Sequence, residues 1–277
     1  MAQSSLSGFL KQYEEALGVQ LFIRTAKGIK PTAAATEYLA KARQIVKEYE
    51  LAQAELWDSE GLDSGFINFG ISSYRGRYMA PKILSRFHQD FPKVVINMDE
   101  ANSMSLEKKL LDGTLDVAIL ARPFVKLDDN LEHLMNDEIL VTTSRDHPIK
   151  KYAHKKSETG WPWLRLEDIA RFGLILSDFD TILGTISREL FYNTTVNLNV
   201  TYPNITAAMT KAMAQAGLGL GFTYASCIDD HDDMPYYSIT KEGVYLPLYL
   251  AYSERVISRK IVREFTRIIK EELGQEV

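Results

Sequence analysis

The polar residues that could do chemistry in this chain gather in three short stretches. The stretches are Ser72-Ser73-Tyr74-Arg75, Asn102-Ser103-Met104 and Thr201-Tyr202-Pro203-Asn204. Each stands at the end of an expected strand and before an expected helix, where ligands of α/β sheets bind. A hydroxyl-lined helix N-terminus favours an anion, typically a carboxylate, and Arg75 or Arg122 could add a charged partner. Because the same residue types cap helices in many proteins, ordinary N-caps are the competing interpretation.

Motifs for catalysis and metal binding are missing from the sequence. Its 5 histidines are scattered, and no HExxH, HxxH or GxSxG pattern is present. The single cysteine, Cys227, excludes an intramolecular disulfide and a Cys-rich metal site, and is more typical of a small packed hydrophobe. The glycine-rich run at 217–222 lacks the Lys-Ser/Thr of a phosphate loop. We therefore expect no enzymatic activity, no metal and no cofactor. The histidines are His88, His133, His147, His154 and His231.

Composition and charge narrow the class of protein. The chain has 277 residues, 45% hydrophobic and 25% charged, which is ordinary for a globular protein of two or three units. No basic segment precedes an apolar one at the start, and no apolar stretch approaches ~18 residues, so we expect a cytoplasmic protein without a membrane span. The net charge of −5 argues against nucleic-acid binding over the whole surface, but not against a small DNA-binding unit.

Alternating strand and helix patterns must position the three polar stretches. Between residues 65 and 137 the pattern reads β-α-β-α-β with short connections, which predicts a parallel sheet with right-handed crossovers. A similar alternation continues to the C-terminus, and an amphipathic helix ends the chain. We expect strands at 66–71, 94–100, 115–120, 138–144, 172–177, 196–202, 218–224 and 244–252. We expect a loop at 72–81 and helices at 83–91, before Gly113, at 182–192, at 205–217 and at 258–273.

The first 60 residues have a different pattern. An amphipathic helix leads into a basic turn at 24–32, and Thr32 is placed to cap a long helix that runs to about Asp58. Apolar residues follow a heptad spacing along that helix, which favours a coiled-coil-like dimer contact over packing on its own domain. The glycines of the stretch 61–65 predict a linker. The heptad positions are Ala35, Ala42, Tyr49 and Leu56, with Tyr38, Ile45 and Ala52.

With these elements placed, the sequence resembles the LysR-type transcriptional regulators over nearly its whole length. The family signature QSxLSxxIxxLExxLGxxLFxRxxxxxxxT is met at Gln3-Ser4-Ser5-Leu6-Ser7, Leu17-Gly18, Leu21-Phe22, Arg24 and Thr32. Further matches are Phe91-Pro92, Asp112-Gly113, Leu115 to Ile119 and Ala216 to Leu220.

The resemblance implies a mixed fold. It comprises a partial winged helix-turn-helix (1–31), a linker helix for dimerisation (32–60) and a two-lobe effector-binding domain like that of periplasmic binding proteins. The lobes would be residues 63–139 with 245–277, and residues 140–244. The resemblance also places effector contacts at the three polar stretches and at Ala121-Arg122, which adds Ala121 to the candidates Ser72, Ser73, Tyr74, Arg75, Asn102, Ser103, Met104, Arg122, Thr201, Tyr202 and Asn204.

The same resemblance makes residues 3–12 a recognition helix and 24–32 a wing. Short polar groups at the start of such a helix meet base edges, and cations of the wing meet the DNA backbone. Gly8 stands where the family often has Arg or Lys, which removes one contact. The expected DNA-binding residues are Gln3, Ser4, Ser5, Ser7, Lys11, Arg24, Lys27 and Lys30.

One departure from the family pattern leaves a second function open. The helices that precede QSxLS in the family are absent from this sequence, so we interpret the chain as truncated within the helix-turn-helix. The first hypothesis is a regulator that binds operator DNA and a small effector as a homodimer or homotetramer. The alternative is an effector-binding and oligomerisation protein without DNA binding. A solute-binding protein of a transporter is disfavoured by the linker helix and the missing signal peptide.

Overall fold

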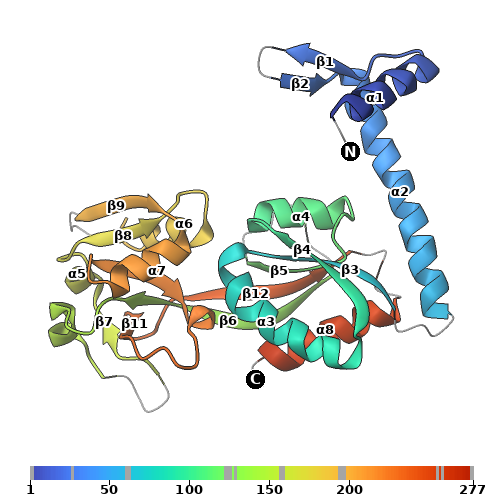
Figure 1. Ribbon diagram of the computed structural model, residues 1–277. Coiled ribbons are helices and arrows are strands. Elements are labelled where there is room, and N and C mark those ends of the chain that lie inside the picture. The colour runs from blue at the N-terminus through green and yellow to red at the C-terminus, as the bar shows by residue number, and fades with distance from the viewer. Residues whose placement is uncertain are drawn as a thin grey trace. The chain divides into compact units, whose positions relative to one another are not determined.

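A computed structural model describes residues 3–25, 28–59, 64–121, 127, 130–155, 160–192, 198–253, 256 and 259–274. The chain divides into two compact units, Met1–Glu60 and Gly61–Val277, which are taken separately below (Figure 1).

The first unit begins with a helix and a small hairpin. Helix α1 (Gln3–Leu17) is followed by the antiparallel strands β1 (Phe22–Thr25) and β2 (Gly28–Pro31). Glu14 ties the helix to the hairpin, since its Oε1 accepts the backbone N–H groups of Leu21 at 2.7 Å and Phe22 at 2.9 Å. Gly18 follows the helix with φ +66°, the left-handed conformation that commonly ends helices. The expected helix, turn and hairpin are confirmed.

Helix α2 (Ala33–Ser59) is the long helix that the sequence predicts. Thr32 caps it, because its Oγ1 accepts the N–H of Ala35 at 3.1 Å. Of the heptad residues, Ala35 is buried, whereas Ile45 is 70% and Tyr49 64% exposed. This leaves an apolar stripe on the middle of the helix facing solvent within the single chain.

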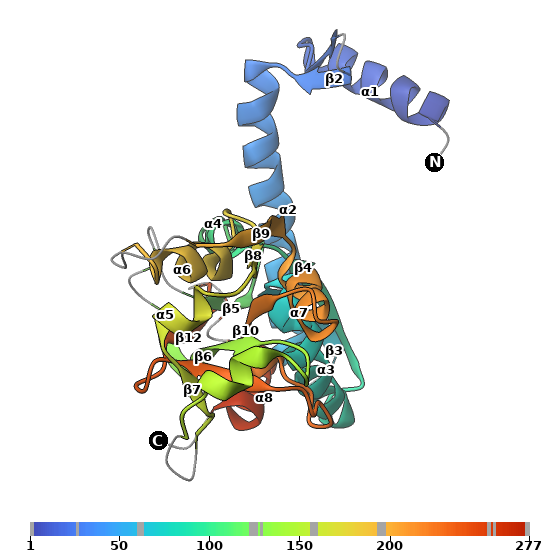
Figure 2. The same cartoon turned by 90° about the vertical axis from the view of Figure 1, so that its left-hand side faces the viewer.

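The first lobe of the second unit is a parallel arrangement with helices on both faces. Strand β3 (Ser64–Ile71) pairs in parallel with β4 (Lys93–Glu100) on one side and β5 (Val117–Ala121) on the other. Figures 1 and 2 show α3 and α8 on one side of this sheet and α4 on the opposite side. The helices are α3 (Ser73–Asp90), α4 (Ser103–Leu111) and α8 (Lys260–Leu273).

The second lobe has its own parallel core. Strand β8 (Leu174–Ser177) lies between β9 (Val200–Ile205) and β10 (Leu220–Tyr224), parallel to both. Helices α6 (Ile182–Glu189) and α7 (Ala207–Gln215) connect these strands. Short elements that the sequence did not predict complete the lobe: η1 (Pro148–Tyr152), β7 (Trp163–Leu164), α5 (Leu166–Ile169), η2 (Ala225–Cys227) and β11 (Tyr236–Ile239).

Strand β6 (Leu131–Thr142) joins the lobes. Residues 131–138 pair with β12 (Tyr245–Tyr252), and residues 139–142 pair with β10 in the second lobe. The sheet order across the described residues is therefore β4-β3-β5-β12-β6-β10-β8-β9, with β11 also paired to β6 and β7 paired to β11. The predicted strand 138–144 covered only the second half of β6. The two-lobe α/β fold class is confirmed.

Two further expectations about the elements were wrong. The stretch 72–81 is helical instead of a loop, because α3 starts at Ser73 and the N–H of Gly76 already bonds to Ser72 O at 2.7 Å. Pro81 lies inside this helix, where it removes a backbone hydrogen bond. Met79 and Ala80 of the same segment are buried, and the free energy of this packing outweighs that loss. Residues 196 and 197 of the predicted strand 196–202 lie outside the described residues. The strand in this region, β9, runs from Val200 to Ile205 and so ends later than predicted.

The core of the first lobe contains an aromatic cluster between α3, β3 and α8. The ring of Phe265 lies edge-on to Phe69, with centroids 5.2 Å apart, and to Phe87, with centroids 4.9 Å apart. All three are fully buried, as is the stripe on α8 that contains Phe265, which confirms the amphipathic terminal helix. Among the helices in the described ranges, none has the length and apolar character needed to cross a membrane.

Candidate functional site

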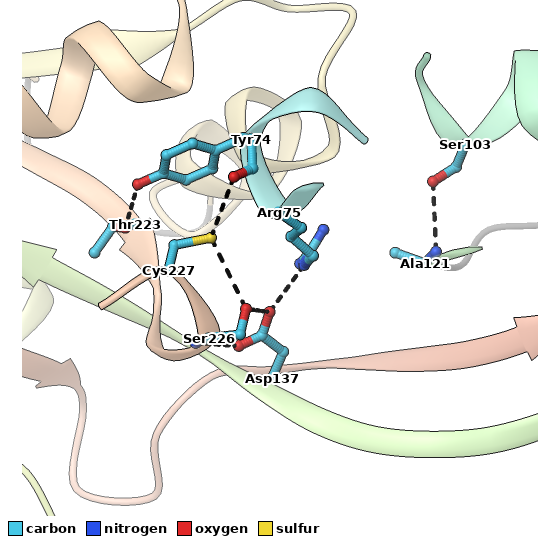
Figure 3. A network of polar contacts seen from close by, with 8 residues as sticks. All are labelled: Tyr74, Arg75, Ser103, Ala121, Asp137, Thr223, Ser226 and Cys227. Carbon is cyan, nitrogen blue, oxygen red and sulfur yellow. Dashed lines mark hydrogen bonds and ion pairs between the residues drawn. The ribbon is translucent and has the colours of Figure 1, made fainter. Parts of the chain in front are cut away.

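The ends of three parallel strands bring the first two polar stretches together. Ile71 of β3 lies opposite Glu100 of β4, and β5 runs in the same direction beside β3, so the segments after all three strands share one edge. At this edge the backbone N–H of Ala121 donates to the Oγ of Ser103 at 3.4 Å (Figure 3). The second polar stretch therefore lies beside the end of β5, as expected.

The polar residues at this edge differ in whether their side chains cap a helix. Asn102 caps α4, because its Oδ1 accepts the N–H of Ser105 at 2.9 Å, as the ordinary N-cap interpretation held. Ser72 occupies the N-cap position of α3, but its side chain makes no capping bond. Met104 lies in the first turn of α4 and is 71% exposed. Arg122 lies outside the described residues. Ser73 is the first residue of α3 and is exposed. The hydroxyls of Ser72, Ser73 and Ser103 are therefore polar groups of this edge that could turn to a ligand.

Arg75 lies in the first turn of α3 and points into the junction of the two lobes. Its Nε donates to Oδ2 of Asp137 in β6 at 2.9 Å, and both side chains are buried. Its guanidinium carbon lies 3.5 Å from the ring centre of Tyr224, a cation–π contact with the end of β10. Burial opposes the charge on Arg75, but Tyr224 and Asp137 outweigh it and hold the pKa above its usual value.

A set of hydrogen bonds ties the same turn to η2 of the second lobe (Figure 3). Both the N–H and the hydroxyl of Ser226 donate to Asp137, at 3.0 Å and 2.7 Å. The hydroxyls of Tyr74 and Thr223 share a hydrogen bond of 2.5 Å. Burial raises the pKa of Tyr74 above its ordinary value, so this phenol stays neutral. The junction around Arg75 is thus a connected network between α3, β6 and η2.

The third polar stretch lies elsewhere than expected. Thr201, Tyr202 and Asn204 belong to strand β9 instead of the segment after it. The residue at that strand end is Thr206, which caps α7 by accepting the N–H of Met209 at 3.4 Å. Asn204 contacts the buried Arg188 within the lobe, with 3.5 Å between Oδ1 and Nη2. The prediction misplaced this stretch because the strand boundary was set too early.

Four residues of the site were missed by sequence reasoning. Asp137, Thr223 and Ser226 carry the network at the junction, and Thr206 stands at the end of β9. The sequence held a signal for one of them. Asp137 stands two residues before the apolar run 139–141, and a carboxylate buried near such a run requires a partner. The others carry no distinguishing pattern in the sequence.

Cys227 is buried in this network, and its reactivity can be predicted. Burial raises the pKa of the thiol to about 12, and although Arg75 lowers it, Asp137 raises it further. At pH 8 the native thiol is therefore neutral, and we expect it to react with a disulfide reagent at least roughly 100-fold more slowly than in urea. The chain has 1 cysteine, so the absorbance of the released thiolate reports this site alone. Equal rates in buffer and in urea would contradict the burial.

The expected DNA-binding residues that the structure describes lie on α1 and on strands β1 and β2. Ser7 and Lys30 are exposed, and Lys11 is exposed beside Glu15, with 3.9 Å between Nζ and Oε1. The side chains of Gln3, Ser4, Ser5 and Arg24, and all of Lys27, lie outside the described residues. Within the described part of the chain, no group of three or more His, Cys, Asp and Glu side chains could hold a metal ion.

A helix-and-hairpin unit, a long helix and a two-lobed α/β unit with polar strand ends define a class of protein: a transcriptional regulator with a substrate-binding domain. The family model "LysR substrate binding domain" matches residues 60–274, and "Bacterial regulatory helix-turn-helix protein, lysR family" matches residues 1–36. The chain therefore belongs to the LysR family of transcriptional regulators.

Relatives agree with this assignment, and solved structures share the fold. A probable RuBisCO transcriptional regulator of Thalassiosira pseudonana is 28% identical over 235 residues, which are 83% of this chain and 74% of that protein. A full-length OxyR variant from Pseudomonas aeruginosa shares the fold with a TM-score of 0.64 at 19% identity, over 99% of this chain and 88% of that one. The regulatory domain of Synechocystis PCC6803 CcmR in complex with 2-PG has a TM-score of 0.62 at 14% identity, over 76% and 98%.

Proposed function

We propose that the second unit senses a small anionic molecule, most simply a carboxylate, and that its binding changes how the chain controls transcription. The ligand lies at the carboxyl ends of β3, β4 and β5. Ser72, Ser73, Tyr74, Arg75, Asn102, Ser103, Met104, Ala121 and Arg122 surround it, and Thr206 takes the place of the earlier candidates in β9. The lobes that close on it are residues 63–139 with 245–277, and residues 140–244.

The observation that carries this proposal is the bond between Ala121 N and Ser103 Oγ. At 3.4 Å it is long, so a ligand oxygen that accepts the Ala121 N–H can replace Ser103 at little cost. The first N–H groups of α4 point to the same edge and favour negative charge. A solved regulatory domain of the same fold carries the small molecule 2-PG, which supports a ligand in this domain.

The first unit supplies the DNA contacts in this proposal. Side chains of α1 meet base edges and phosphates, and the hairpin meets the backbone. The stripe at Ile45 and Tyr49 on α2 packs against α2 of a second copy, because exposed apolar side chains at heptad spacing are typical of a coiled-coil contact. A regulator works where the DNA is, which places the chain in the cytoplasm. The DNA contacts are Gln3, Ser4, Ser5, Ser7, Lys11, Arg24, Lys27 and Lys30.

Ligand binding and DNA binding are linked through the lobes. A ligand that binds one arrangement of the lobes better than another shifts the population toward it. The change alters the packing of the second units in an oligomer, and hence the spacing of the DNA-binding units.

The test is a gel-shift titration of the full chain on the DNA upstream of its own gene, with and without a panel of small carboxylates. We expect retardation that weakens steeply with salt, and one or more carboxylates that change it. In this proposal the Ser103 hydroxyl, once released from the Ala121 N–H, donates to the ligand. Ser103→Ala should therefore weaken the response to that carboxylate by roughly 5- to 10-fold, the effect of one hydrogen bond. Ser85→Ala, at an exposed position of α3, is the matched control and should leave the response unchanged.

Two results would contradict the proposal. DNA retardation that no carboxylate alters would remove the anionic effector. An effect of Ser85→Ala as large as that of Ser103→Ala would remove the site.

A further inference from the structure

Strand β4 leaves one of its two edges unpaired. It is the first strand of the sheet order and pairs only with β3 among the described residues. The N–H of Ala101, directly after β4, donates to the last residue of β3 at 3.3 Å, whereas the N–H of Val94 turns away to the end of α3. Because successive residues of a strand point their backbone groups to opposite sides, the N–H and C=O groups of Ile96 and Met98 point away from β3. No hydrogen bond within the described part of the chain reaches these four groups, which are called the free edge below.

The strand at the other end of the sheet order, β9, is protected against pairing with another chain. Pro203 lies within it and has no N–H to offer, and the pairing of β9 with β8 shifts register at two points. A proline and an irregular register are devices by which natural edge strands avoid such pairing. Strand β4 has neither, since it runs for 8 residues without a proline and stays in register with β3 throughout.

Apolar side chains stand along the free edge. Val95 is 57% and Met98 39% exposed, and Ile96 is half-buried. Side chains directly opposite each other on two paired strands contact and cover one another. A strand added at this edge would therefore take both the unpaired backbone groups and part of the exposed apolar surface of β4 out of water.

We propose that β4 pairs with β4 of a second copy of the chain, antiparallel and about a two-fold axis at Asn97. In this register Ile96 of each copy exchanges two backbone hydrogen bonds with Met98 of the other, so all groups of the free edge are used. The side chains of these two residues then lie opposite each other, apolar on apolar. The contact goes beyond the proposed function, because it joins second units and requires neither an effector nor DNA.

The charges of β4 favour a second copy in this orientation. The exposed Lys93 begins the strand, and Asp99 and the exposed Glu100 end it. Antiparallel pairing sets the basic end of each strand beside the acidic end of the other, whereas a parallel arrangement would bring like charges together. A self-complementary edge of this kind closes with two-fold symmetry, so a third chain finds no edge left to extend.

The test is a cross-link at the two-fold axis. Opposed residues of a pair that is not hydrogen-bonded have Cα atoms about 4.5 Å apart, a distance that a disulfide spans. We therefore expect Asn97→Cys in the full chain to form a covalent dimer on mild oxidation, seen on a non-reducing gel. Val95→Cys is the matched control, because position 95 is also exposed but its two Cα atoms would lie about 13 Å apart. The native Cys227 is buried and contributes to neither.

A second variant removes the pairing and keeps the strand. The N–H of Met98 points away from β3, so Met98→Pro takes no hydrogen bond from the pairing of β3 with β4. We expect Asn97→Cys/Met98→Pro to cross-link at least roughly 10-fold more slowly than Asn97→Cys, since each dimer loses two hydrogen bonds. Met98→Val keeps the N–H and an apolar side chain, and in the same background it should retain the cross-link. Circular dichroism of each variant checks that the fold is unchanged.

Three outcomes overturn the strand pairing: no cross-link in Asn97→Cys, cross-linking of Val95→Cys as fast as that of Asn97→Cys, or equal rates with Met98→Pro and Met98→Val. If Met98→Pro fails to fold, the comparison of positions 95 and 97 decides alone. None of these outcomes touches the effector site, which the gel shift with Ser103→Ala tests separately.

Discussion

Asp137→Ala should destabilise the second unit by about 3–5 kcal/mol, the cost of removing one partner from a buried ion pair. The substitution leaves the guanidinium of Arg75 in a buried position without its carboxylate, and it also removes the acceptor of Ser226 N–H and Oγ. The measurement is urea unfolding of the full chain, followed by tyrosine and tryptophan fluorescence.

The matched control is Asp230→Ala. Asp230 pairs with Lys82 at 3.6 Å between the same two regions, but both side chains are exposed, 79% and 56%. Exposed pairs contribute about 0–1 kcal/mol, so the control should change the unfolding midpoint little. The double variant Arg75→Met/Asp137→Leu should recover most of the loss, because replacing both charges leaves neither unpaired. Equal losses of unfolding free energy in Asp137→Ala and Asp230→Ala would show that the buried network stabilises the protein no more than an exposed ion pair.

Gly184→Ala should cost about 3 kcal/mol, at the upper end of what one added methyl group costs in a packed region. A Cβ at this position would lie 2.0 Å from Asp178 O and 2.7 Å from Ser177 O, and backbone atoms cannot turn aside as a side chain can. Gly184 allows the first turn of α6 to pack directly on the end of β8. Arg188 then donates to Ser177 O at 2.7 Å and to Gly184 O at 2.6 Å.

Gly8→Ala provides the contrast in α1. A Cβ there meets no atom within 4 Å, and alanine favours a helix over glycine by about 0.5–1 kcal/mol. We therefore expect Gly8→Ala to raise the helical circular-dichroism signal slightly and Gly184→Ala to lower the unfolding midpoint. A Gly184→Ala chain as stable as the wild type would mean that α6 can move away from β8 without loss.

Local signals predicted most of the elements. Thr32 caps α2 and Gly113 follows α4 with φ +64°, because a cap or a left-handed residue acts on its own turn of helix. The buried strand β5 reads as an apolar run, since parallel strands are covered on both faces. Such features depend on neighbours within a few residues, and the sequence displays them.

The two wrong predictions of secondary structure also have physical causes. The start of α3 was placed too late because Pro81 usually breaks a helix, and the burial of Met79 and Ala80 that outweighs it depends on the rest of the fold. The first half of β6 was missed because buried or half-buried side chains are interspersed there with exposed ones and form no continuous apolar run. Tertiary contacts decided both cases.

The sequence by itself determined the family, the order of the elements and the strand ends where polar residues gather. Only the tertiary structure decided which polar groups meet. Arg75 reaches Asp137 across 62 residues, and Ser226 reaches it across 89. No local pattern encodes such a contact, because it arises from the sheet topology, in which β6 passes from one lobe into the other. The buried Arg75–Asp137 pair is a product of that topology.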